Sequence, residues 1–185
     1  MLLRALVTVV CFWLHALAFA QGPASLEQLQ LSRADEGLQL AYSVRLDLPR
    51  AAEEALHKGV PLYFVAEARL ARQRWYWRDA TVARAERQWR LTHQALTRQY
   101  RLSTGGLHQS YGSLVEALAA VRRASAWPLE LREEPASDAA YLLSFSLRLD
   151  TRQLPGPLQI GLGADADWGV RRERAVLPAE LGLAS

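Results

Sequence analysis

The residues with the most distinctive chemistry are arginines interleaved with aromatic side chains between residues 69 and 101. Three of the six tryptophans lie there, with arginines beside each aromatic group. Residues 67–101 hold nine arginines against three carboxylates, a net charge of +6. The flanking segments are mildly acidic, since residues 21–66 hold four basic and six acidic side chains and residues 102–185 hold eight and ten. We therefore predict a one-sided basic face that meets an anionic partner.

Strand parity indicates which of these side chains reach that partner. Burying one aromatic side chain is worth roughly 4–6 kcal/mol gross, whereas an exposed ion pair is worth about 0–1 kcal/mol. We therefore assign Trp75, Trp77 and Trp89 to the core and the opposite face to binding. The candidate binding residues are Arg74, Tyr76, Arg78, Arg87, Arg90 and Arg98. The alternative interpretation is a solvated arginine face over a tryptophan core, without a binding role.

The rest of the chain shows no pattern typical of catalysis or of a metal or cofactor site. Its histidines after the N-terminal segment are His57, His93 and His108, which are expected on a helix, a strand and a loop. No two of them have the close spacing of a local metal-binding motif. Ser113 lacks the second glycine of a nucleophile elbow, and Asp165 and Asp167 are followed by arginines rather than by calcium ligands. We predict no catalytic residues, no metal ion and no cofactor.

An enzymatic alternative uses the carboxylates of the basic stretch. A hydrolase or lyase of envelope polymers needs two carboxylates within reach of each other in a cleft. The candidates are Glu67, Asp79 and Glu86. If these three lie far apart and fully solvated, the alternative loses its basis.

The N-terminal twenty residues have the pattern of an export signal. Arg4 precedes an apolar run from Ala5 to Ala20, which ends in a small-x-small motif with cleavage predicted after Ala20. The run has 16 residues, fewer than the ~20 that span a bilayer. We therefore expect a cleaved signal and a periplasmic product rather than an uncleaved anchor. The single cysteine, Cys11, lies inside this segment, so no disulfide is expected in the mature chain.

Alternating hydrophobicity predicts most of the remaining chain as strands. Residues 38–48 alternate strictly between apolar and polar side chains, the pattern of a half-buried strand. Further strands are predicted around residues 29–31, 60–72, 87–95, 127–131, 141–149 and 168–176. Residues 79–83 are expected to form the turn of a long twisted hairpin. Because the apolar parity changes after Ala95, we expect a bulge or bend near residues 94–97.

Two short helices interrupt the strands. Pro49 and Gly59 bound the first, at residues 51–58. Ser113 and Glu116 form a capping box for the second, which ends near Ala124. Neither helix is long enough to be stable alone, so each must pack on a sheet.

These elements predict a mainly β fold: an antiparallel β-sandwich or a strongly curved sheet with two short helices. A closed barrel and an α+β arrangement are the alternatives. We expect a single domain over residues 21–176 and a flexible C-terminal tail over residues 177–185.

Several segments of the chain resemble one family of the proteobacterial envelope. The segments are Leu46–Leu48, Leu56–Phe64, Arg74–Trp77, Leu96–Leu102, Leu149–Asp150 and Gln153–Gln159. They cover nearly all the mature chain in the same order, and they resemble the domain-of-unknown-function family 4390, also described as proline-rich signal peptide proteins. The family has no assigned activity, so the resemblance transfers no site residues. It does imply a signalling partner, because such genes often lie near a membrane-bound sensor kinase. Ala95 stands where the family pattern has proline.

The sequence therefore predicts an exported, non-catalytic interaction module. Its expected partner is an acidic protein, such as the external domain of a sensor kinase, with an anionic lipid or glycan as alternatives. Export argues against nucleic acid as the ligand of the basic stretch, although stacking and phosphate contacts would suit it. A structural role at the inner-membrane surface is the third function considered. The sequence does not indicate the oligomeric state.

Overall fold

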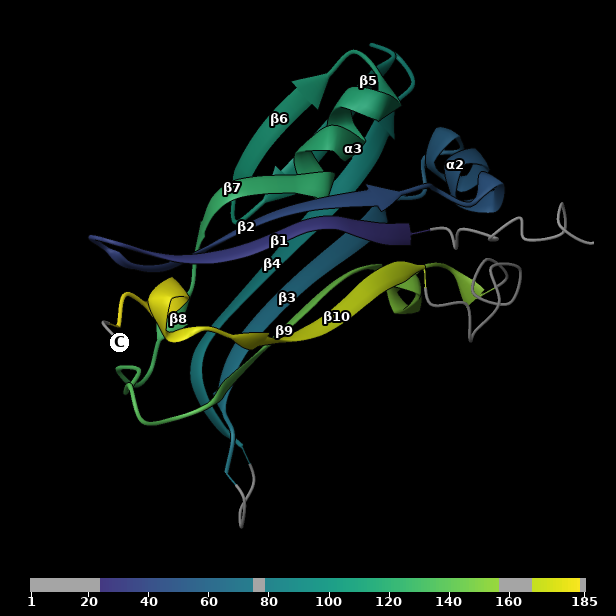
Figure 1. Cartoon of the computed structure of the whole chain (residues 1–185). Coiled ribbons are helices and arrows are strands. Elements are labelled where there is room, and N and C mark those ends of the chain that lie inside the picture. The colour runs from purple at the N-terminus through teal and green to yellow at the C-terminus, as the bar shows by residue number, and fades with distance from the viewer. Residues whose placement is uncertain (1–23, 75–78, 157–167, 184–185) are drawn as a thin grey trace, which may run out of the picture.

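The computed structural model describes residues 24–74, 79–156 and 168–183. These residues form two antiparallel sheets, two α-helices and two short 3-10 helices (Figure 1). The mainly β prediction is confirmed, and within the described ranges the strands do not close into a barrel. The smaller sheet and both helices lie on one side of the larger, curved sheet.

The smaller sheet has three strands in the order β1-β2-β7, with bounds β1 Ala24–Ala34, β2 Gly37–Leu46 and β7 Arg123–Pro128. Every second side chain of β2 is buried, as its alternating sequence predicts. Gly37 has a φ of 122° in the tight β1–β2 turn, a backbone conformation that side chains with a Cβ rarely adopt.

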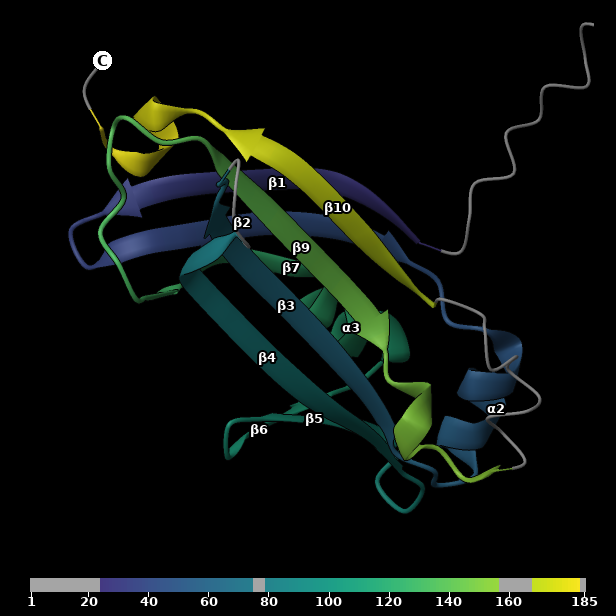
Figure 2. The same cartoon turned by 90° about the horizontal axis from the view of Figure 1, so that it is seen from below.

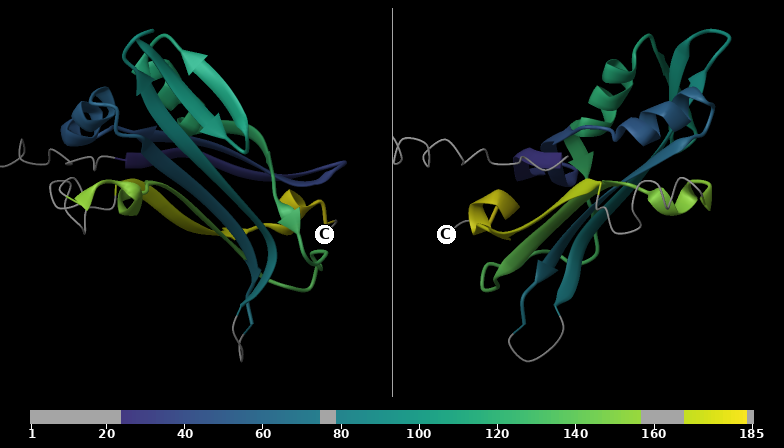
Figure 3. Two further views of the ribbon diagram at one scale, coloured as in Figure 1. Left: turned by 180° about the vertical axis from the view of Figure 1, so that it is seen from behind. Right: turned by 90° about the vertical axis from the view of Figure 1, so that its right-hand side faces the viewer.

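The larger sheet has the order β10-β9-β3-β4-β5-β6, and the short strand β8 also pairs with β4. Its strands are β3 Leu62–Arg72, β4 Ala80–Gln94, β5 Gln99–Thr104, β6 Leu107–Tyr111, β8 Glu130–Leu131, β9 Tyr141–Leu149 and β10 Gly169–Val176. Strands β3 and β4 form the long central hairpin that the sequence predicts, and they run along most of the molecule (Figure 3).

The core lies between the two sheets. In β3 the even-numbered residues from Leu62 to Leu70 face inward, and they pair with inward-facing odd-numbered residues of β4 and β9. From the opposite sheet, Tyr42 packs against Phe145 with ring centroids 4.8 Å apart. Trp89 is buried, as predicted. Trp75 and Trp77, which the sequence also assigns to the core, lie outside the described residues.

Both helices lie where the sequence predicts them. Helix α2, Arg50–His57, buries Ala52, Ala55 and Leu56. Helix α3, Leu114–Arg122, begins after Ser113, whose side chain accepts a hydrogen bond from the Glu116 backbone N–H at 3.2 Å. Each helix therefore uses a narrow apolar face to pack on the strands, as short helices must.

The bulge or bend predicted near residues 94–97 is a tight turn that ends one strand and starts the next. Strand β4 ends at Gln94 and β5 begins at Gln99, and Arg98 in the turn between them has a φ of 54°. The parity changes there because the chain reverses direction. A bulge does occur in β4, where Val82 is an extra residue opposite the step from Leu70 to Ala71 in β3. Val82 and Ala83 are therefore both buried although they are consecutive.

Three further expectations need correction. Residues 79–83 were expected to be a turn, but β4 already begins at Ala80. His108 was expected in a loop and lies on β6. The C-terminal residues are not a loose tail as far as they are described: Pro178–Leu181 form the 3-10 helix η2, in which Leu181 is fully buried. A bidentate contact from Arg174 to Glu180 holds this helix to β10.

Candidate functional site

Among the described residues, no helix or strand covers the face of the larger sheet that points away from the smaller sheet (Figure 2). We call it the outer face. Figure 2 shows it on β10, β9, β3 and β4, with the smaller sheet and α3 behind. Its charged side chains are Arg69, Arg84, Arg90, Arg101, Arg148, Arg171, Glu67, Glu86, Glu130 and Glu173. Six arginines therefore accompany four glutamates on the strands of the larger sheet, which makes this face net basic.

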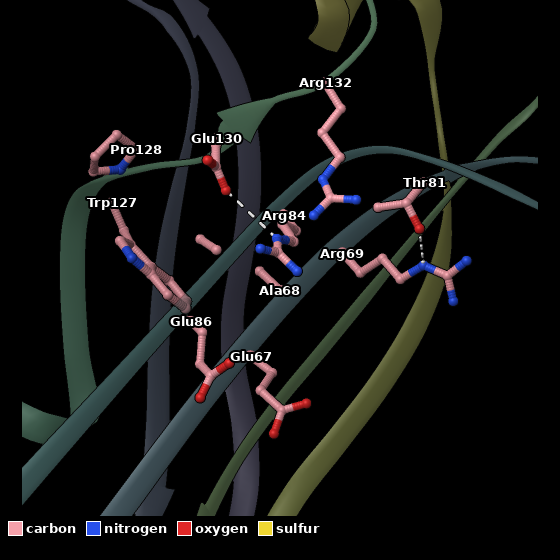
Figure 4. A pocket seen from close by; sticks show the side chains of 11 residues that line it. Glu67, Ala68, Arg69, Thr81, Arg84, Glu86, Trp127, Pro128, Glu130 and Arg132 are labelled. Carbon is pink, nitrogen blue, oxygen red and sulfur yellow. Dashed lines mark hydrogen bonds and ion pairs between the residues drawn. The ribbon is translucent and has the colours of Figure 1, made fainter.

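A cavity of about 650 Å³ lies on the outer face where β3 and β4 meet the segment 127–132. We call it the charged groove (Figure 4). Its charged lining residues are Glu67, Arg69, Arg84, Glu86, Glu130 and Arg132, and its apolar lining includes the exposed Pro128 and the buried Trp127. The volume is within the roughly 300–1,000 Å³ that is usual for sites of small ligands.

The register of β3 and β4 places like charges opposite each other in the charged groove. Glu67 lies opposite Glu86. Two residues further along the strands, on the same face, Arg69 lies opposite Arg84. None of these four side chains forms an ion pair with another of the four. Directly opposed like charges destabilise a sheet by roughly 0.2–1 kcal/mol, so this arrangement is not explained by stability.

Three of these four side chains interact with residues at the border of the groove. Glu67 pairs with Arg148 at 3.2 Å, and Arg84 with Glu130 at 3.5 Å. Arg69 Nε donates to Thr81 Oγ1 at 2.8 Å. Glu86 has no hydrogen bond or ion pair with any residue that the structure describes.

The basic residues predicted as one binding face are spread along the central hairpin. Arg74 follows the end of β3, and its backbone N–H donates to Asp79 Oδ1 at 3.3 Å. Arg98 lies in the turn at the far end of β4, a strand of 15 residues, which spans roughly 50 Å. Arg90 is exposed on the outer face, opposite Tyr63. Tyr76 and Arg78 lie outside the described residues.

The sequence assigns Arg87 to the basic face, but the structure places it on the inner side of the larger sheet. It has the same parity as Trp89, so both point toward the smaller sheet. The guanidinium carbon of Arg87 lies 5.4 Å from the centre of the Trp127 ring and 5.9 Å from that of Trp89. Arg87 therefore joins the two sheets by cation–π contacts.

Two histidines that are 36 residues apart meet beside α2. The rings of His57 and His93 have centroids 5.1 Å apart, and His57 Nε2 lies 2.8 Å from the Tyr100 hydroxyl. The cluster of His57, His93 and Tyr100 could not be predicted from local sequence spacing, because it depends on how α2 packs on β4. In the described ranges, no group of three or more His, Cys, Asp or Glu side chains is arranged to hold a metal ion. Asp165 and Asp167 lie outside those ranges.

The structure brings together two of the three carboxylates considered for catalysis. Glu67 and Glu86 line the same groove, and their side chains extend side by side (Figure 4). Asp79 lies elsewhere, next to Arg74 beyond the end of β3. A general acid in a glycosidase is usually held protonated by an apolar, buried environment, and both glutamates are exposed.

A family model described as a domain of unknown function (DUF4390) matches residues 21–177. The match begins at the residue that follows the predicted cleavage position. No curated protein and no solved structure shows a significant match to the chain. A membrane-spanning helix is not found among residues 24–74, 79–156 and 168–183.

Proposed function

The chain belongs to the DUF4390 family, and we propose that it is an exported, non-catalytic binding module whose outer face receives an acidic protein partner in the periplasm. The observation that carries this proposal is the outer face, which no described element covers and which has six arginines against four glutamates on its strands. The export pattern of residues 1–20 supports the location. The resemblance to proteins encoded near a sensor kinase supports a kinase external domain as the partner.

Some of the outer-face arginines are available for such a partner. Arg90 and Arg171 are exposed and have no hydrogen bond or ion pair with any described residue. Arg148, in contrast, is engaged by Glu67 and by Asp150, at 3.2 and 3.6 Å. An arginine without an internal partner can form a bidentate contact with a carboxylate of another protein, so Arg90 and Arg171 are the strongest candidates for contact.

Photo-crosslinking in intact cells tests the proposal. A photoreactive residue at Gln88, which is exposed on the outer face between Arg90 and Glu86, should yield a covalent adduct with a protein. The double variant Arg90→Glu, Arg171→Glu should lose the adduct while keeping its fold. The matched control is Lys58→Glu, Arg123→Glu, which makes the same change of charge at exposed positions off this face. An adduct that survives the first double variant, or one that contains lipid or glycan, refutes the acidic protein partner.

A second candidate function is cleavage of an envelope polymer by a hydrolase or lyase reaction, because Glu67 and Glu86 line one groove. Glycosidases use such carboxylate pairs as acid and base or nucleophile. The pairing of Glu67 with Arg148 and the exposure of both side chains make this the weaker candidate. Release of reducing ends or peptide fragments from purified envelope polymer, abolished by Glu67→Gln and by Glu86→Gln, would establish it.

A further inference from the structure

The charged groove has a second property that the docking of an acidic protein leaves unexplained: it is bipolar. We propose that it binds a small dipolar ligand with an ammonium group at one end and a carboxylate or phosphate group at the other. The ammonium group lies at Glu67 and Glu86, and the acidic group lies at Arg69, Arg84 and Arg132. This site is separate from the proposed protein contact through Arg90 and Arg171. Each of the two proposals can therefore be refuted without refuting the other.

The two rows of like charge define the two ends of the site. Glu67 and Glu86 form one row across β3 and β4. Arg69 and Arg84 form the next row on the same face, which Glu130 of β8 continues opposite Arg84. Two residues along a strand correspond to roughly 7 Å, which is comparable with the separation of the charged ends of a dipeptide. Each row costs stability when empty because of its opposed like charges, and a ligand charge of opposite sign removes that cost.

The two side chains that lack a partner stand at the two ends of the groove. Glu86 at the acidic end and the guanidinium of Arg132 at the basic end have no hydrogen bond or ion pair with any described residue. Between them, Arg84 is held by Glu130 (Figure 4). The backbone N–H of Arg132 donates to Val82 O at 2.8 Å, which fixes the segment that carries this side chain beside β4.

The acidic end also distinguishes this site from a general anion site. A groove for phosphate or for a carboxylate alone would have no unpaired glutamate, since like charge repels the ligand. Glu130 at the basic end is paired with Arg84. Here Glu86 is uncompensated within the same cavity. Pro128, which is exposed, supplies apolar surface for the carbon atoms between the two charged groups of the ligand.

Calorimetric titration of the intact mature chain tests the proposal with defined probes. The dipolar probes are alanyl-alanine, which ends in a carboxylate, and phosphoethanolamine, which ends in a phosphate. The single-charge probes are ethylammonium, acetate and inorganic phosphate. At least one dipolar probe should bind, about tenfold or more tightly than any single-charge probe, because two charge-assisted contacts act together. Which dipolar probe binds identifies the acidic group.

The variants Glu86→Gln and Arg132→Gln should each weaken binding of the dipolar probe about tenfold. The matched controls are Glu36→Gln in the β1–β2 turn and Arg123→Gln on β7, both at exposed positions outside the groove, and they should leave the affinity unchanged. Thermal unfolding midpoints that are not lowered in any of the four variants exclude a folding defect. The proposal is overturned if neither dipolar probe binds, or if Glu86→Gln leaves binding intact and inorganic phosphate binds equally well.

Discussion

The guanidinium carbon of Arg87 lies 5.4 Å from the centre of the Trp127 ring, and this contact joins a strand of the larger sheet to a strand of the smaller one. Trp127 in turn packs edge-on against Tyr42, with ring centroids 6.0 Å apart. Arg87 thus stands at the centre of an aromatic layer between the sheets. Its role in the described structure is to pack the core, in contrast to the exposed Arg90 on the same strand.

Replacing Arg87 with alanine should lower the free energy of unfolding by about 1–2 kcal/mol, because cation–π contacts and the packing of the aliphatic stem are lost together. The exposed neighbour Arg90 provides the matched control. Arg90→Ala should stay within about 0.5 kcal/mol of the natural protein. Urea denaturation measures both, and equal effects of the two changes would contradict the inner placement of Arg87.

The stability should fall at high pH because of Tyr42. Burial raises the pKa of the Tyr42 phenol from 10.0 to about 12, although the positive charge of Arg87 acts in the opposite direction. In the unfolded chain a tyrosine ionises near pH ~10, so between about pH 10 and 12 only the unfolded state releases this proton. The contribution to the free energy of unfolding is therefore complete below pH ~10 and declines above it by about 2–3 kcal/mol.

Tyr42→Phe should flatten this alkaline decline when urea denaturation is repeated at several pH values. The variant should also lose stability at neutral pH, by roughly 1–3 kcal/mol, because the phenol donates a hydrogen bond to Val121 O at 3.1 Å. Tyr63→Phe on the outer face is the control and should keep the decline. An unchanged pH profile in Tyr42→Phe would show that other groups dominate it.

Truncating Leu181 should destabilise the protein even though it lies near the C-terminus. The side chain is fully buried under η2, so Leu181→Ala should cost about 2–5 kcal/mol. Leu177 is 67% exposed, and Leu177→Ala should change the stability by less than about 0.5 kcal/mol. Thermal unfolding distinguishes the two, and equal melting temperatures would restore the interpretation of this segment as a loose tail.

Replacing Glu86 with glutamine should stabilise the unliganded protein. Removing one member of the opposed Glu67–Glu86 pair relieves like-charge repulsion worth roughly 0.2–1 kcal/mol. Glu36→Gln removes the same charge in an exposed turn and controls for the change of net charge. A loss of stability in Glu86→Gln would mean that Glu86 has a structural role rather than a role in binding.

Helix α3 should depend on its N-terminal cap. Because the Ser113 side chain accepts the Glu116 backbone N–H, Ser113→Ala should lower the free energy of unfolding by about 0.5–2 kcal/mol. Ser125→Ala at an exposed position of β7 is the control. Similar midpoints in urea for the two variants would indicate that the cap contributes nothing.

The elements of the fold could be predicted because their signals are local. The strict alternation from Leu38 to Leu46 and from Tyr141 to Leu149 indicates strands with one buried face, since successive side chains of a strand point to opposite sides. Ser113 marks the start of α3 for an equally local reason. The sequence predicted the turn after Gln94 only as a bulge or bend, because a change of parity accompanies both a bulge and a reversal of the chain.

The candidate site was only partly predictable. The excess of arginine on the central hairpin is visible in the sequence, but its division between two faces placed Arg87 wrongly. The charged groove was not predicted, because it needs the segment from Trp127 to Arg132 to pass along the edge of β4, more than forty residues away in the chain. The glutamates were considered as catalytic groups and not as one end of a bipolar site.

By itself, the sequence determined the mainly β fold, the two helices, the long central hairpin and the concentration of positive charge on it, because all four follow from side-chain periodicity and composition. Only the tertiary structure decided which charges meet. Strand register set Glu67 opposite Glu86 and Arg69 opposite Arg84, and sheet packing turned Arg87 toward Trp127. Register and packing depend on the whole core, since a shift of one residue would move every side chain to the other face.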